Sequence, residues 1–332
     1  MTGDPRSILV LRYSALGDVV LATSVLDPLR ARYPGARIEW VTSPAYAPLL
    51  EGLPQLSGVH RLGPGLGGAR ELARSLRGRF DLAIDLQHKV RSALVARAAA
   101  PRRLALRRRT VGQALLAILG WDPPRRAPHA TQLYAGALRP LGIQRPGQTH
   151  VHLSGAARAR AAAALAGSAA PRVALAPGAS RATKRWPAER FAEVAEALAA
   201  RGASVVLAGG PADREALSAF RAACRVPIAA DLTSLPVDGL AAALAEVRLL
   251  VACDSGPVHL ATAVGTPALA IFGPTSPERW GPPPPGRALA LPLDCAPCSN
   301  HGDDRCPRGH HRCMADLGAA VVGAAAVDLL GG

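Results

Sequence analysis

Residues 249–275 read LLVACDSGPVHLATAVGTPALAIFGPT and predict a strand, a turn, a short helix and a second strand in succession. The apolar runs Leu249 to Cys253 and Ala268 to Phe272 are typical of strands buried on both faces of a parallel sheet. Between them we expect a helix from His259 to Val264, closed by Gly265. The stretch therefore predicts an α/β protein with parallel strands.

The turn between this strand and this helix contains Asp254, Ser255 and Gly256, and His259 follows one helical turn later. Ligands of open α/β sheets bind beyond the carboxyl ends of the strands. The unpaired N–H groups of a helix N-terminus suit phosphate there. These four residues are therefore candidate ligand contacts. The alternative is an ordinary connection, in which Asp254 caps the helix and His259 is a core residue.

The same alternation of strand and helix occurs in both halves of the chain. A single helix is expected at 19–32, and residues 63–68, GPGLGG, are interpreted as a flexible loop rather than a dinucleotide-binding turn, since they follow the third strand. Further strands are expected at 7–11, 37–42, 58–62, 80–86, 172–176, 204–208 and 226–230. Two such runs predict two doubly wound, Rossmann-like domains, at 1–150 and 151–332.

The net charge of +15 is distributed unevenly. Residues 1–165 contain 24 Lys and Arg against 9 Asp and Glu, whereas residues 166–332 contain 15 of each. This asymmetry indicates an anionic partner for the first half. The alternative is that the arginines are ordinary solvent-exposed surface residues. Only Lys89 and Lys184 are lysines among the 39 basic residues. A lysine kept in a strand-exit loop suggests a mobile point charge beside a phosphate.

Nucleic acid is an unsuitable partner, because aromatic residues are only 4% of the chain and no reader motif is present. The N-terminal residues are polar, so no secretory signal is expected. Prolines and glycines within 255–277 argue against a spanning helix there. The expected location is the cytoplasm, with peripheral contact to the inner face of the cytoplasmic membrane.

The tail contains four cysteines, Cys295, Cys298, Cys306 and Cys313. Their spacing is compatible with a structural zinc ion, although it fits no standard zinc finger. Disulfides are not expected in a cytoplasmic protein.

Four motifs in order resemble glycosyltransferase family 9, the heptosyltransferases of lipopolysaccharide core assembly. They are RYSALGDVVLATSVL at 12–26, PGASRATKRWP at 177–187, LAGGPADRE at 207–215 and DSGPVHLATAVGTPALAIFGPTSPERWGP at 254–282. The cysteine tail also resembles the end of many members, more often of the enzymes that add the second heptose. The resemblance implies a GT-B fold, in which two Rossmann-like domains face a cleft. It also implies an ADP-heptose donor and an inverting transfer.

The resemblance also assigns roles to single residues. Asp18 matches the proposed general base, and Lys184 matches a lysine that contacts the donor phosphates. The donor set implied is Ser180, Thr183, Lys184, Asp213, Asp254, Ser255, Gly256 and His259, with Asp213 near the ribose. In the turn around Asp18, Tyr13 and Ala15 depart from the usual Ser-rich pattern, and Asp213 is shorter than the glutamate often found.

The acceptor implied is a phosphorylated, lipid-linked sugar of the lipid A–Kdo type, which suits the basic first half. The candidate acceptor contacts are Ser14, Gly17, Lys89, Arg91, Arg107 and Arg108. Lys184 and helix amides stabilise the leaving diphosphate in this scheme, so no cofactor is required for transfer. Two alternatives remain open: a member that uses another nucleotide-sugar and acceptor, and a non-catalytic nucleotide-sugar-binding protein.

Overall fold

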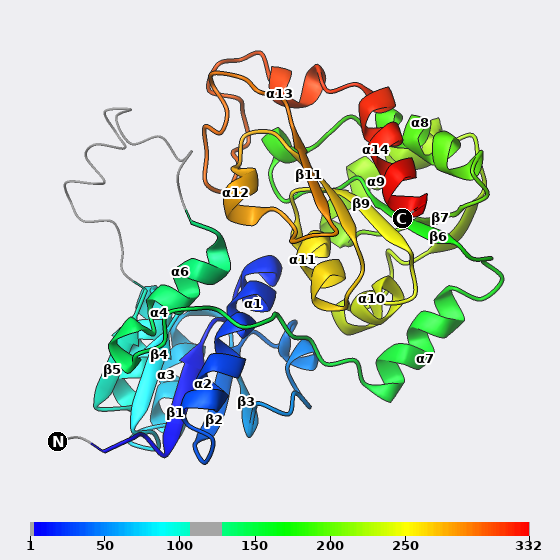
Figure 1. Ribbon diagram of the computed structural model, residues 1–332. Helices are drawn as coiled ribbons and strands as arrows, with labels where there is room; N and C mark the ends of the chain where they lie inside the picture. The colour runs from blue at the N-terminus through cyan, green and yellow to red at the C-terminus, as the bar shows by residue number, and fades with distance from the viewer. Residues whose placement is uncertain (1–2, 107–127, 332) are drawn as a thin grey trace. The chain divides into compact units, whose positions relative to one another are not determined.

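The computed structural model describes residues 3–106 and 128–331. The chain divides into two compact units. The described part of the first unit consists of residues 3–106 and 130–152, and that of the second of residues 128–129 and 153–331. Each unit contains one β-sheet flanked by helices (Figure 1). Arg107 and Arg108, two of the candidate acceptor contacts, lie outside the described residues.

The sheet of the first unit has the strand order β3-β2-β1-β4-β5, and all its strands are parallel. The chain moves outward from β1 to β3 and then returns to the other side of β1 with β4. The switch point of this doubly wound sheet therefore lies at the carboxyl ends of β1 and β4. The strands are β1 (Ser7–Leu11), β2 (Arg37–Thr42), β3 (Gly58–Arg61), β4 (Leu82–Asp85) and β5 (Arg102–Ala105).

Helices and 3₁₀ turns connect these strands. They are α1 (Leu16–Ala22), η1 (Thr23–Val25), α2 (Leu26–Arg32), η2 (Ala47–Leu49), α3 (Gly65–Ser75), α4 (Val90–Ala99), α6 (Ala130–Gly136) and η4 (Arg139–Leu141).

Several bounds differ from the sequence-based expectation, and the helix expected at His259 begins at Gly256. Two differences in the first unit have a local cause. The predicted single helix at 19–32 is interrupted by η1, where Thr23 Oγ1 donates to the carbonyl of Val20 (2.6 Å) and Ser24 Oγ to that of Leu21 (2.7 Å). Such bonds back to the preceding turn favour a bend in the helix. Residues 63–68 are not a loop throughout, because α3 begins at Gly65. A Cβ atom at Gly68 would lie only 2.6 Å from the carbonyl carbon of Gly63, so this tight entry into the helix requires glycine.

The sheet of the second unit has the order β11-β10-β9-β6-β7-β8 and is also parallel. Its switch point lies at the carboxyl ends of β6 and β9. The strands are β6 (Arg172–Ala176), β7 (Ser204–Leu207), β8 (Ile228–Asp231), β9 (Leu249–Cys253), β10 (Ala268–Phe272) and β11 (Arg287–Ala290). Strands β9 and β10 have the bounds that their apolar runs predict, and both are fully buried.

The connecting elements of the second unit bury a core around Trp186, Phe191 and Phe220. Helix α14 packs beside α8, although the two are far apart in the sequence (Figure 1). The elements are α7 (Gly155–Ala164), η5 (Ala182–Lys184), α8 (Ala188–Ala199), η6 (Pro211–Asp213), α9 (Arg214–Ala223), α10 (Val237–Leu244), α11 (Gly256–Ala263), α12 (Pro277–Trp280), α13 (Arg312–Ala315) and α14 (Ala319–Gly331).

A search of the described residues finds no helix with the length and apolar character to cross a bilayer.

Candidate active site

Asp18 lies at the switch point of the first unit, in the first turn of α1. One carboxylate oxygen, Oδ2, is 2.7 Å from Nη2 of Arg12. The other, Oδ1, accepts a hydrogen bond of 2.6 Å from the hydroxyl of Tyr134 in α6. The guanidinium of Arg12 also lies over the Tyr134 ring, 5.4 Å from its centroid. Asp18 is therefore held from both sides, while 16% of its side chain stays exposed.

The loop after β1 is hydrogen-bonded to the loop after β4. Arg12 Nη1 donates to the carbonyl of Leu86 (2.7 Å). The side-chain oxygen of Gln87 accepts from the backbone N–H groups of Tyr13 (3.1 Å) and Ser14 (3.2 Å). These contacts join the two strand exits of the switch point. They fix the positions of Asp18 and Ser14 at this edge of the sheet.

Of the candidate acceptor contacts, Lys89 and Arg91 lie in different surroundings. Lys89 is exposed at the N-cap of α4. Arg91 is half-buried, donates to the carbonyl of Gly63 and lies over the Tyr13 ring, 5.0 Å from its centroid. Burial raises the pKa of Tyr13, and the Arg91 charge partly opposes that rise. Arg91 thus links two strand-exit loops, and its contact with an acceptor stays a prediction.

The second unit has a cluster at its own switch point. Lys184 follows β6, and Asp254 follows the neighbouring β9. The ammonium nitrogen of Lys184 is 3.3 Å from Oδ2 of Asp254, and the Thr275 hydroxyl donates to the same oxygen (2.7 Å). Lys184 is only 9% exposed and Asp254 5%. The structure therefore brings together two residues that the sequence places 70 positions apart.

Asp213 lies after β7, the strand beside β6, and approaches the Lys184 loop closely. A Cβ atom at Gly178 would lie 2.2 Å from the carboxyl carbon of Asp213, so only glycine permits this approach. Asp213 Oδ2 also accepts from the backbone N–H of Gly210 (3.0 Å). Asp213 thus lies at the same sheet edge as Lys184, and its contact with the donor ribose stays a prediction.

The remaining donor candidates surround this edge. Ser255 is the N-cap of α11 in extended conformation and Gly256 is its first residue, so backbone N–H groups are available at the helix N-terminus. His259 is buried, with its ring 6.4 Å from that of Trp280. Ser180 is exposed in the loop after β6. Thr183 is buried, and its hydroxyl hydrogen-bonds to the backbone of Asp303.

The four tail cysteines are free thiols in unlike surroundings. Cys313 is buried against Gly273, where an added Cβ atom would be 3.2 Å from its sulfur, whereas Cys298 is exposed. Within residues 3–106 and 128–331, no three His, Cys, Asp or Glu side chains are grouped so as to hold a metal ion. The structure thus does not assemble these cysteines into a metal site, and the zinc ion stays a prediction.

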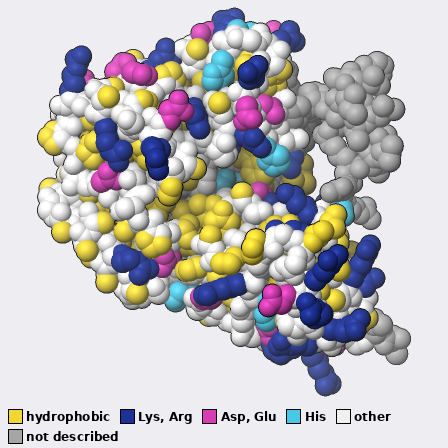
Figure 2. Space-filling model, turned by 180° about the vertical axis from the view of Figure 1, so that it is seen from behind, with side chains coloured by type: hydrophobic (Ala, Val, Ile, Leu, Met, Phe, Trp, Pro, Cys, Tyr) yellow, Lys and Arg dark blue, Asp and Glu magenta, His cyan; other side chains and the backbone are white. Residues whose placement is uncertain are grey.

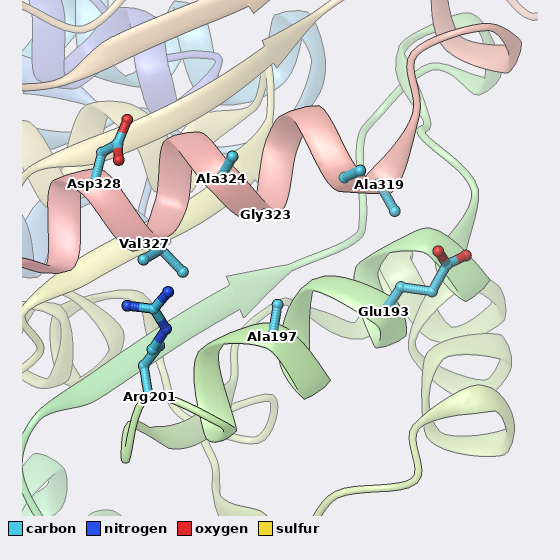
Figure 3. A pocket seen from close by; sticks show the side chains of 9 residues that line it. Glu193, Ala197, Arg201, Ala319, Gly323, Ala324, Val327 and Asp328 are labelled. Atoms are coloured by element: carbon cyan, nitrogen blue, oxygen red, sulfur yellow. The ribbon is translucent and has the colours of Figure 1, made fainter.

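A groove between α8 and α14, with a volume of about 550 Å³, is a separate feature of the second unit (Figure 3). Small side chains such as Ala197, Gly323 and Ala324 line its middle, and Arg201 and Asp328 lie toward one end. None of the candidate donor residues lines it. The groove therefore takes no part in the candidate site.

Sequence reasoning did not single out three residues that complete these clusters, namely Arg12, Tyr134 and Thr275. Arg12 and Thr275 lie inside the quoted motifs at strand exits, so their positions could have indicated a role. Tyr134 lies 116 positions from Asp18, and no local pattern connects the two.

Two doubly wound parallel sheets, each with a cation, a carboxylate and a hydroxyl clustered at its carboxyl edge, are the architecture of the GT-B class. Residues 69–305 match glycosyltransferase family 9 (heptosyltransferase). The chain belongs to this family.

Named relatives agree with this assignment. The chain is 30% identical over 322 residues to lipopolysaccharide heptosyltransferase 1 of Pseudomonas aeruginosa, covering 88% of this chain and 85% of that protein. It is 31% identical over 308 residues to lipopolysaccharide heptosyltransferase 2 of Escherichia coli, covering 86% and 88%. The solved structure of the E. coli ADP-heptose heptosyltransferase II superposes with a TM-score of 0.76 at 25% identity, covering 98% of both chains.

Proposed function

We propose that this protein transfers heptose from ADP-heptose to the inner core of lipopolysaccharide, with inversion at the anomeric carbon. The relatives are named as heptosyltransferases of lipopolysaccharide, and one is named with ADP-heptose. The single observation that most supports the proposal is the pair of charged clusters, one at the switch point of each sheet.

The second unit supplies the donor site in this proposal. Lys184 and the backbone N–H groups at Ser255 and Gly256 provide positive charge for the diphosphate of ADP-heptose. That charge becomes more important as the bond from the sugar to ADP breaks, because the leaving group gains negative charge. Asp213 meets the ribose in this proposal, which its closeness to Gly178 of the same loop supports.

The first unit supplies the base and the acceptor contacts. The carboxylate of Asp18 takes the proton from the acceptor hydroxyl as that oxygen bonds to the anomeric carbon. The bond between this carbon and ADP breaks on the opposite face, which inverts the configuration. Arg12 and Tyr134 hold the carboxylate in one orientation for this step.

The acceptor is an anionic lipid-linked sugar at the inner face of the cytoplasmic membrane, where the protein acts peripherally. Figure 2 shows Lys and Arg side chains gathered over the first unit. Helices α3 and α4 of this unit pack together, and the two helices and the residues just after α3 expose several arginines to solvent, namely Arg70, Arg74, Arg77, Arg79 and Arg97. Such a surface attracts the phosphates of the acceptor and anionic headgroups.

A transfer assay tests the proposal. Purified protein is incubated with ADP-heptose and either of two truncated acceptors, one ending in Kdo and one in a single heptose. Mass spectrometry is expected to show a gain of one heptose on one of them, and which acceptor gains it fixes the position in the core. Binding of ADP-heptose without transfer to either acceptor would contradict the proposed acceptor class. No binding would contradict the donor.

A further inference from the structure

A segment of the cysteine-rich tail, residues 298–303, lies across the loop that contains Lys184. We call it the tail strap. Thr183 and Asp303 are joined by three hydrogen bonds: Thr183 N–H to the Asp303 carbonyl (3.1 Å), the Thr183 hydroxyl to the same carbonyl (2.7 Å), and Asp303 N–H to that hydroxyl (2.8 Å). A side-chain nitrogen of His311 also contacts the carbonyl oxygen of Thr183 at 2.7 Å. The residue preceding Lys184 is therefore fixed by the tail.

Gly302 of the tail strap packs directly on the Lys184 side chain. A Cβ atom at this position would lie 2.7 Å from Cγ of Lys184 and 3.1 Å from its Cδ. Gly302 is buried and has a φ of +78°, a conformation that favours glycine. The backbone of the strap thus covers the aliphatic stem of Lys184, whose ammonium meets Asp254.

The other end of the tail strap is attached next to Thr275, whose hydroxyl donates to Asp254. The backbone N–H groups of Cys298 (2.9 Å) and Ser299 (2.8 Å) both donate to the carbonyl of Pro274, the residue before Thr275. The indole N–H of Trp280 donates to the carbonyl of Asn300 (3.0 Å). The strap therefore connects the two segments that supply the cation and the hydroxyl around Asp254.

We propose that the tail strap positions Lys184 for the donor diphosphate, with Thr183 and Gly302 as positioning residues. The inference rests on the proposed donor role of Lys184. A lysine has four rotatable side-chain bonds, and ordering it costs binding free energy unless the protein has already ordered it. The strap restrains the lysine stem before ADP-heptose arrives. On this account the hydroxyl of Thr183 acts within the protein rather than on the donor.

Two glycine substitutions in the tail form a matched pair for testing this. Gly302 and Gly309 have nearly the same backbone conformation, with φ values of +78° and +72°, but a Cβ atom at Gly309 meets nothing within 4 Å. Both Gly302→Ala and Gly309→Ala incur backbone strain, whereas only Gly302→Ala displaces Lys184. We expect Gly302→Ala to raise the KM for ADP-heptose by about tenfold without raising that for the acceptor. Gly309→Ala should change neither by more than about twofold.

A second pair of variants serves if Gly302→Ala fails to fold. Thr183→Val removes the hydroxyl that bonds to Asp303. Thr266→Val removes an equally buried hydroxyl, which donates to the carbonyl of Leu244 (2.6 Å) instead. We expect only Thr183→Val to raise the KM for ADP-heptose, by about fivefold. Urea unfolding of both variants reports any general loss of stability.

Equal KM values for ADP-heptose within each folded pair would overturn the role of the tail strap. That result is distinct from a failure of the proposed function, in which the unsubstituted protein itself transfers no heptose. The strap is supported when the unsubstituted protein is active and the donor KM rises only in the variants that contact the lysine loop.

Discussion

Each of the two units has a cation, a carboxylate and a hydroxyl at the carboxyl edge of its sheet. In the first unit the carboxylate is held by the other two groups, whereas in the second the cation is held by the carboxylate. In the first, Arg12 lies 2.7 Å from Asp18, whose second oxygen accepts from the Tyr134 hydroxyl. In the second, Lys184 lies 3.3 Å from an oxygen of Asp254 that also accepts from the Thr275 hydroxyl. Each cluster thus combines a carboxylate, a cation and a hydroxyl donor.

The difference lies in the cation. The guanidinium of Arg12 is a planar fork, and its other terminal nitrogen is bonded to the carbonyl of Leu86, so it serves as a fixed support for Asp18. The ammonium of Lys184 is a point charge with three donors, and Asp254 acts as its support. The comparison teaches that similar clusters can be built around opposite charges: a carboxylate held by its neighbours in the first unit and an ammonium held by a carboxylate in the second.

The largest effect is expected from Asp18→Asn, which keeps the shape and removes the proton acceptor. Turnover should fall by about 10²-fold or more, because general-base catalysis commonly contributes 10²–10⁴. Steady-state transfer with saturating acceptor measures it. Asp4→Asn is the control, since Asp4 pairs with Arg32 on an exposed surface. Turnover unchanged in Asp18→Asn would remove Asp18 from the base role.

Lys184→Met comes next and removes the cation while nearly keeping side-chain length. We expect kcat/KM for ADP-heptose to fall by about 10- to 100-fold, since a charge-assisted contact to phosphate is lost. The change also leaves Asp254 buried without its cation, so the free energy of unfolding should fall by about 3 kcal/mol. Urea unfolding measures that loss. Adding Asp254→Asn should recover part of the stability but none of the activity, and recovery of both would argue against a donor role.

Tyr134→Phe should have a smaller effect on the first cluster. It removes one hydrogen bond to the charged form of Asp18, so we expect kcat to fall about fivefold. Steady-state transfer with both substrates saturating measures kcat. A kcat equal to that of the unsubstituted protein would mean that Tyr134 only packs against α1. Tyr33→Phe, at a buried tyrosine after α2 whose ring lies under Arg32, is the control.

Thr275→Val should have the smallest effect. It leaves Asp254 paired with Lys184 but removes the neutral donor on the shared oxygen. Because Lys184 still pairs with the carboxylate, the KM for ADP-heptose should rise only about two- to fivefold with kcat unchanged. Substrate titrations of the rate separate the two constants. If the KM for ADP-heptose rose more in Thr275→Val than in Lys184→Met, Thr275 rather than Lys184 would be the more important donor contact of this cluster.

Much of this arrangement was predictable from the sequence. Strands β9 and β10 begin and end where their apolar runs do, because a buried parallel strand leaves no room for polar residues between its turn signals. The rule that ligands meet the carboxyl ends of strands also indicated Asp18, Lys184 and Asp254. Their positions follow from local pattern and sheet topology alone.

The supporting contacts were not predictable in the same way. Tyr134 reaches Asp18 from 116 positions away, and Asp303 reaches Thr183 from 120. Such contacts depend on how separate elements pack, which no local period encodes. The interruption at η1 likewise depends on whether the hydroxyls of Thr23 and Ser24 turn back to the helix or outward.

The division of labour between the two clusters is tested most directly by calorimetric titration of ADP-heptose into Asp18→Asn and Lys184→Met. The account predicts that Asp18→Asn binds the donor within a few-fold of the unsubstituted protein, while Lys184→Met binds it at least about tenfold more weakly. The opposite pattern, with donor affinity lost in Asp18→Asn and kept in Lys184→Met, would contradict it.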